Sequence, residues 1–169
     1  SPMPRLQSRK LSPWAMKWML NLFPPLLFQR IKILEFSADF QYCRVRVKRS
    51  IWTRNLHGTT FGGTIYSAAD SPLPMLYWQI FAQRGLQVES WLQAGRIRYE
   101  KPAATELILE FRLSDEQVAW ATGELETNGR FRQSIDVQAV DQSGAVCAQI
   151  TMEAYVRLSR DKRGAPAAF

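Results

Sequence analysis

A long apolar segment, residues 62–84, limits this chain to few architectures. Its only charged residue before Arg84 is Asp70, and Gly85 follows directly, so the segment predicts a buried helix that ends at this glycine. Pro72 lacks the backbone donor that a helix interior requires, and we therefore expect a kink or restart beside it. Because a helix this apolar is not stable facing water, other elements must enclose it.

Alternating apolar and polar residues on both sides of this helix predict the strands that enclose it. Two strands precede the helix, and four follow it with a short polar helical turn among them. We expect the strands at 31–36, 42–50, 88–99, 106–113, 130–140 and 146–158, with a hairpin turn at 141–144. An antiparallel sheet that wraps around one helix encloses it most simply, which gives an α+β fold.

A further short helix is expected near the N-terminus, where Ser12 is typical of an N-cap and Pro13 of the first helical position. One face of this helix carries apolar residues, namely Trp14, Trp18, Met19 and Leu22. We expect that face to cover one end of the sheet. The alternative is contact with a membrane surface or with an acyl tunnel. Lys17, Asn21 and two prolines interrupt the segment too often for it to span a bilayer.

The loop before the central helix brings chemistry to the helix start. Gly62 and Gly63 present backbone N–H groups that have no intrahelical partner and no side chain in front of them, which suits a developing oxyanion. Asp70 lies two turns further on the same face, about 10 Å along the helix axis. One carbonyl cannot contact both groups of a single helix. If both act on it, two antiparallel copies of the helix must share the site, which predicts a dimer or a larger oligomer.

This loop and helix resemble those of hot-dog-fold acyl-CoA thioesterases of the phenylacetate-degradation type. Those enzymes usually read N-x-x-G-x-x-H-G-G and then an acid; the residues that match in place are Asn55, Gly58, Gly62, Gly63 and Asp70. Phe61 stands where the family has its histidine. By element order the resemblance runs from Arg30 to Leu158, and it is closest to a branch with a helical N-terminal extension.

The resemblance implies a hot-dog domain at residues 30–159, a helical extension at 1–29 and a flexible tail at 160–169. It also implies hydrolysis of an acyl-CoA or related thioester. The carbonyl oxygen would lie at the glycine amides, and Asp70 would activate water or attack directly. The amide of Asn55 would hold the water or the carbonyl. The substrate would supply the coenzyme A moiety, and no other cofactor is expected.

Each candidate residue also has a structural interpretation. Asp70 or Ser71 would serve as the N-cap of a helical segment that begins at Pro72. Asn55 is of a type that often only stabilises a turn. His57, the only histidine, is either a loop hydrogen-bonding residue or a group that titrates near neutrality in the site.

Two other functions compete with hydrolysis. The first is a hydratase or dehydratase of the same fold, in which His57 and Asp70 move protons on a 3-hydroxyacyl or enoyl thioester. The second is a non-catalytic acyl- or lipid-binding module, in which Asp70 is only a cap. With one histidine and no ligand cluster, the sequence predicts no metal site.

The net charge of +7 has a structural explanation in strands whose basic residues alternate with apolar ones. The functional alternative is a basic rim that attracts the phosphates of coenzyme A, formed by Arg44, Arg46, Lys48 and Arg54. Nucleic-acid binding is not expected, because no helix-turn-helix, zinc or RNA-binding signature accompanies the charge. Cys43 and Cys147 lie far apart among apolar residues, which predicts buried thiols and a cytoplasmic location.

Overall fold

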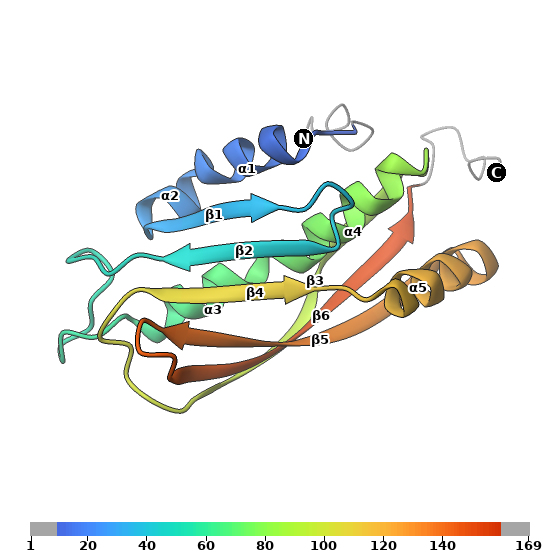
Figure 1. The fold of residues 1–169 in the computed structure, drawn as a ribbon. Coiled ribbons are helices and arrows are strands. Elements are labelled where there is room, and N and C mark those ends of the chain that lie inside the picture. Colours follow the sequence, from blue (N-terminus) through green and yellow to red (C-terminus); the bar gives the residue numbers. More distant parts are fainter. Residues whose placement is uncertain (1–9, 160–169) are drawn as a thin grey trace.

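The computed structural model describes residues 10–159, which form one antiparallel sheet with helices on its inner face and at its edge (Figure 1). The order of the strands in the sheet is β1-β2-β4-β5-β6-β3. The strands are β1 (Ile31–Phe36), β2 (Tyr42–Val47), β3 (Val88–Tyr99), β4 (Leu107–Arg112), β5 (Arg130–Asp141) and β6 (Val146–Leu158). All six strands were predicted, and the 141–144 turn joins β5 to β6 as expected.

The central helix consists of two segments, α3 (Gly62–Asp70) and α4 (Pro72–Gln83), separated at Ser71. The restart beside Pro72 is confirmed. The core lies between these helices and the inner face of the sheet, where Leu76 and Phe81 of α4 are fully buried. Figure 1 shows α3 and α4 passing behind β2 and β4, so the sheet wraps around them as the sequence predicted.

The expected short helical turn after β4 is wrong in length, because α5 (Asp115–Asn128) has 14 residues. Ser114 and Gln117 form a reciprocal capping box at its start, and Gly129, with φ of 70°, closes it in the left-handed conformation. Val118, Ala121 and Leu125 are its buried residues. Three buried residues give a polar helix only a weak apolar periodicity, so the pattern did not predict its length. The capping-box residues at its start do indicate a helix N-terminus.

Two helices precede the sheet, α1 (Pro13–Asn21) and α2 (Pro24–Phe28). Ser12 caps α1 through its side chain, which accepts a hydrogen bond from the Ala15 N–H. The prediction of which face of α1 covers the sheet is wrong. Met16 and Leu20 are buried in the common core, whereas the exposed residues include Trp14, Trp18 and Leu22. Both helices therefore pack against the core of the main domain through a few buried side chains. The predicted C-terminal tail lies outside the described residues.

The two edges of the sheet differ. At the β1 edge, the buried side-chain amide of Asn21 accepts a hydrogen bond from the Ile33 N–H (2.7 Å) and donates one to the Ile33 carbonyl (3.0 Å). Asn21 thus occupies backbone groups that a further strand would use. At the other edge, β3 pairs only with β6 among the described strands. The β3 edge is therefore the one open to strand addition.

Candidate active site at the start of the central helix

The loop that precedes α3 is held by backbone hydrogen bonds. The Phe61 N–H donates to the Thr53 carbonyl (2.7 Å), and the Thr60 N–H donates to the Ala103 carbonyl (2.9 Å). Arg54 and Thr60 form an isolated antiparallel bridge between the two sides of the loop. These contacts fix the entry into α3 against the turn that follows β3.

Asn55 closes this loop. Its amide oxygen accepts hydrogen bonds from the N–H groups of His57 (3.0 Å) and Thr59 (3.2 Å), and its amide nitrogen donates to the Thr59 hydroxyl (2.8 Å). The structure therefore gives Asn55 the turn-stabilising contacts that its residue type suggests. His57 is exposed, and within residues 10–159 its imidazole makes no hydrogen bond.

The start of α3 has no side-chain cap. The Thr64 N–H donates to the Phe61 carbonyl (3.0 Å), while the N–H groups of Gly62 and Gly63 have no hydrogen-bond partner in the described part of the chain. Two free amides at a helix N-terminus favour an anionic or partly negative oxygen. The sequence predicted free amides at this position, and their role as an oxyanion site stays a prediction.

Two aromatic rings lie against these glycines. A Cβ atom on Gly62 would lie 2.8 Å from Cζ of Tyr99, and one on Gly63 would lie 2.7 Å from Cε1 of Phe61. The Tyr99 hydroxyl also donates to the Gly62 carbonyl (2.8 Å). Burial raises the pKa of Tyr99, with a smaller contribution from Tyr66, so the hydroxyl remains a donor at neutral pH. Sequence reasoning missed Tyr99 because this contact joins residues far apart in the chain.

Asp70 ends α3, and its side chain is exposed. Within residues 10–159 its carboxylate makes no hydrogen bond or ion pair, and no side chain caps the start of α4. The capping interpretation of Asp70 therefore has no contact to support it. Desolvation by neighbouring atoms raises the pKa of Asp70 above its ordinary value, which makes the ionised carboxylate a better proton acceptor.

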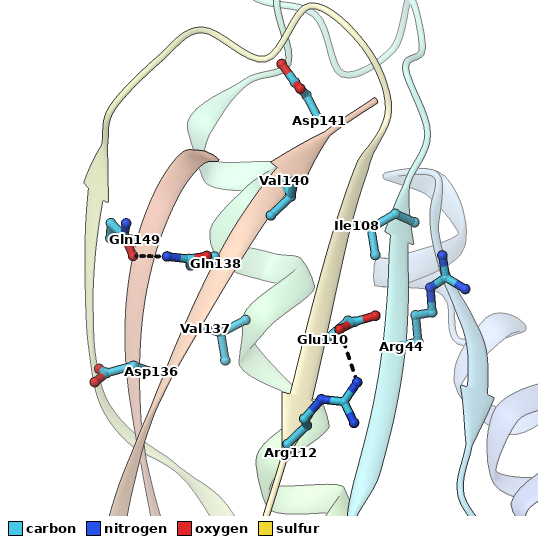
Figure 2. A pocket seen from close by; sticks show the side chains of 10 residues that line it. All are labelled: Arg44, Ile108, Glu110, Arg112, Asp136, Val137, Gln138, Val140, Asp141 and Gln149. Atoms are coloured by element: carbon cyan, nitrogen blue, oxygen red, sulfur yellow. Dashed lines mark hydrogen bonds and ion pairs between the residues drawn. The ribbon is translucent and has the colours of Figure 1, made fainter. Parts of the chain in front are cut away.

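The predicted basic rim is divided between two places. Arg54 lies in the loop before α3, but Arg44 and Arg46 alternate with the buried core residues of β2 and so lie on the outer face of the sheet. Figure 2 shows Arg44 there beside Glu110 and Arg112, in a cavity of about 600 Å³. Lys48 follows β2, and its N–H donates to the Arg30 carbonyl (3.1 Å). The structure thus brings only Arg54 near the free glycine amides.

The described residues contain no group of three or more His, Cys, Asp or Glu side chains that could hold a metal ion. Cys43 and Cys147 are free and buried, and burial raises the pKa of both thiols.

A protein-family model described as a domain of unknown function, DUF4442, matches residues 12–156, including α1 and α2. No curated protein matches the sequence. Among solved structures, a Pseudomonas aeruginosa protein of unknown function, described as a probable thioesterase, is 18% identical with a TM-score of 0.76. The similarity covers 94% of this chain and 98% of that one.

Two further structures are similar. The Escherichia coli PaaI protein of the phenylacetic acid degradation operon is 14% identical, with a TM-score of 0.58 over 84% of this chain and 89% of that one. A Streptococcus mutans protein bound to acetyl-CoA is 18% identical, with a TM-score of 0.57 over 79% of this chain and 94% of that one. At these identities the likeness establishes the fold, which is the hot-dog fold that the sequence predicted.

Proposed function

The chain belongs to the DUF4442 family, and from its hot-dog fold and the groups along α3 we propose that it hydrolyses acyl-CoA or related thioesters. The observation that carries the proposal is the free carboxylate of Asp70 on a helix that begins with two free glycine amides. An acid placed beside Ser71 and Pro72 would ordinarily cap the next helix. Here it makes no such contact and has a raised pKa, which suits a general base.

The reaction uses these groups in sequence. The thioester carbonyl oxygen accepts hydrogen bonds from the N–H groups of Gly62 and Gly63, which stabilise the negative charge that develops on it. The Asp70 carboxylate takes a proton from a water molecule, and the water oxygen forms the new bond to the carbonyl carbon. The carbon–sulfur bond then breaks, and the departing thiolate receives that proton from Asp70. Arg54 attracts the phosphates of coenzyme A by its charge.

The proposed site lies between two copies of the chain. Gly63 and Asp70 are two turns apart on one helix, so a single small carbonyl would use Gly63 of one copy and Asp70 of the other. The β3 edge is open among the described strands, whereas Asn21 blocks the β1 edge, so pairing of β3 with a second copy is the contact we favour.

The comparisons support this choice of substrate class. One structural neighbour is described as a probable thioesterase, and another was solved with acetyl-CoA bound. The two free, buried cysteines are consistent with a reducing, cytoplasmic compartment.

The decisive measurement is release of free thiol from short, medium, long and aromatic acyl-CoAs. Asp70→Asn should lower turnover about a hundredfold or more, the size expected for loss of a general base. Glu116→Gln, which changes an exposed acid on α5, is the matched control and should leave turnover unchanged. Equal turnover in wild type and Asp70→Asn would remove Asp70 from the chemistry. Turnover of enoyl-CoA alone would identify a hydratase.

A second pair of variants tests the glycine amide. Gly63→Pro removes the N–H donor in the first turn of α3, where no intrahelical hydrogen bond is lost, and Gly63→Ala keeps the donor while adding a similar contact with Phe61. Only the proline variant should lose activity. Mixing the inactive Gly63→Pro and Asp70→Asn proteins should restore about a quarter of wild-type activity, because half of the dimers then contain one intact site. No recovery from freely exchanging subunits would contradict a shared site.

A further inference from the structure

Large apolar side chains are exposed at the β1 edge of the molecule. Trp14 is 70% exposed, Phe28 75% and Trp52, in the loop after β2, 75%. The other exposed members of this surface are Trp18, Leu22, Phe23, Leu27 and Ile51. We call these eight residues the N-terminal apolar surface. Clusters of exposed large apolar side chains mark interaction sites, whereas single exposed apolar residues are common on any protein surface.

A groove connects α2 to the loop that carries Trp52. Leu27 and Phe28 of α2, Arg30 and Trp52 line a cavity of about 630 Å³. Trp14 and Trp18 on α1 lie next to each other, with ring centroids 6.4 Å apart. Figure 1 shows α1 and α2 lying along β1, the edge strand at the opposite end of the strand order from β3. Pairing of β3 with a second copy would leave this surface uncovered.

The net charge of the whole chain resides in the same part of the sequence. Residues 10–69 contain nine lysines and arginines and only two carboxylates, whereas the rest of the chain has thirteen of each. The nine cations are Lys10, Lys17, Arg30, Lys32, Arg44, Arg46, Lys48, Arg49 and Arg54. The two carboxylates, Glu35 and Asp39, lie at the end of β1 and in the turn after it, toward the start of α1 but away from α2 and the Trp52 loop.

We propose that the N-terminal apolar surface binds a bilayer that contains anionic lipids. Tryptophan rings favour the boundary between headgroups and acyl chains, and flanking lysines and arginines add attraction to lipid phosphates. No helix among residues 10–159 is long and apolar enough to cross a membrane. In this proposal the chain lies on the bilayer surface, with α1 and α2 at the level of the headgroups.

A second copy of the chain is a poorer occupant of this surface. A two-fold contact there would bring Lys17 of α1 and Arg30 beside α2 toward the same residues of the other copy, and residues 10–34 contain no carboxylate to offset the repulsion. An anionic bilayer instead supplies the opposite charge over the whole surface. The charge distribution thus favours lipid over self-association.

Co-sedimentation with lipid vesicles tests the proposal. The full chain should sediment with vesicles of phosphatidylcholine and phosphatidylglycerol, and much less with pure phosphatidylcholine. The double variant Trp14→Ala/Trp52→Ala should weaken partitioning at least tenfold. Trp120→Ala is the matched control, because Trp120 is 47% exposed but lies on α5, and it should bind like wild type. Circular dichroism verifies that each variant is folded.

Charge variants provide an independent readout. Lys17→Gln and Arg30→Gln should each weaken binding to anionic vesicles about fivefold. Arg130→Gln, at the start of β5, should have no effect. Equal binding to neutral and anionic vesicles, an equal loss with Trp120→Ala, or no binding at all would overturn the proposal. So would a tryptophan double variant that becomes a monomer while wild type is a dimer, because the surface would then be a subunit contact. None of these measurements depends on thioesterase activity.

Discussion

The hydroxyl of Tyr99 donates a hydrogen bond to the carbonyl oxygen of Gly62, 2.8 Å away. Tyr99 is the last residue of β3, the strand with the open edge, and Gly62 is the first residue of α3. The bond therefore joins the candidate oxyanion site directly to the strand that we expect to pair with a second copy. Any partner that orders β3 also acts on the position of the Gly62 and Gly63 amides.

Removing this hydroxyl should lower activity more than it lowers stability. Tyr99→Phe keeps the ring against Gly62 but loses the bond, which costs about 1 kcal/mol at a half-exposed position. We expect about a tenfold fall in kcat with little change in KM, because the amides lose their fixed orientation. Tyr155→Phe on β6 is the control and should change neither value. Unchanged kcat in Tyr99→Phe would show that the bond has no part in positioning the site.

Asp70 should make the folded state less stable at neutral pH than it is in acid. Its pKa is raised in the folded chain, so the folded state binds more protons than the unfolded state between the ordinary value of 3.8 and the raised one. The free energy of unfolding therefore falls as pH rises through that window. Asp70→Asn removes the ionised group and should raise Tm at pH 7, whereas below pH 3.8 the difference should disappear.

Thermal unfolding followed by circular dichroism at both pH values measures this effect. The rise will be small, because water partly screens an exposed carboxylate. Glu116→Gln, which also replaces an exposed carboxylate, is the control for loss of a surface charge. A lower Tm for Asp70→Asn at pH 7 would mean that the carboxylate has a stabilising partner.

The sequence predicted the elements of this fold well, because they depend on local periodicity and on turn residues. The β3 and β6 strands, the restart beside Pro72 and the Ser12 cap all follow from neighbours in the chain. The buried face of α1 could not be predicted in the same way. Trp14 and Trp18 form the more hydrophobic face, but Met16 and Leu20 are the residues that fit against the sheet, and Asn21 is buried because it binds Ile33.

The candidate site was predictable only in part for the same reason. The glycine pair and Asp70 lie on one helix, so their spacing could be derived from residue numbers. Tyr99 reaches Gly62 across the fold, and no local pattern indicates that contact. The alternation in β2, by contrast, already predicted that Arg44 lies on the charged outer face of the sheet.

Replacing Asn21 should destabilise the β1 edge. Asn21→Leu leaves the N–H and carbonyl of Ile33 without partners in a buried position, which costs roughly 2–4 kcal/mol. At about 2–4 °C per kcal/mol for a domain of this size, Tm should fall well beyond the error of the measurement. Asn128→Leu, which loses an exposed bond to Glu124, should cost far less. An Asn21→Leu protein as stable as wild type would show that water satisfies Ile33.

Tyr66 should determine whether Gly95 can be replaced. Gly95 lies in β3, and a Cβ atom there would collide with the Tyr66 hydroxyl oxygen and lie 2.9 Å from the Met152 sulfur. Gly95→Ala must therefore displace one of these side chains. We expect a loss of about 1–3 kcal/mol, the usual range for overpacking. Tyr66→Phe removes the atom in closest contact, so the double variant should recover part of the loss.

Urea unfolding of the two single variants and the double variant measures the coupling between Gly95 and Tyr66. Gly123→Ala in α5 is the matched control, since a Cβ atom there would meet nothing within 4 Å. Alanine favours the helix over glycine, and this control should gain about 0.5–1 kcal/mol. If the changes in unfolding free energy of Gly95→Ala and Tyr66→Phe add in the double variant, the Tyr66 side chain moves aside freely and position 95 does not require glycine. Coupling would instead mean that Tyr66 is fixed between α3 and β3, next to the strand edge that the proposed dimer uses.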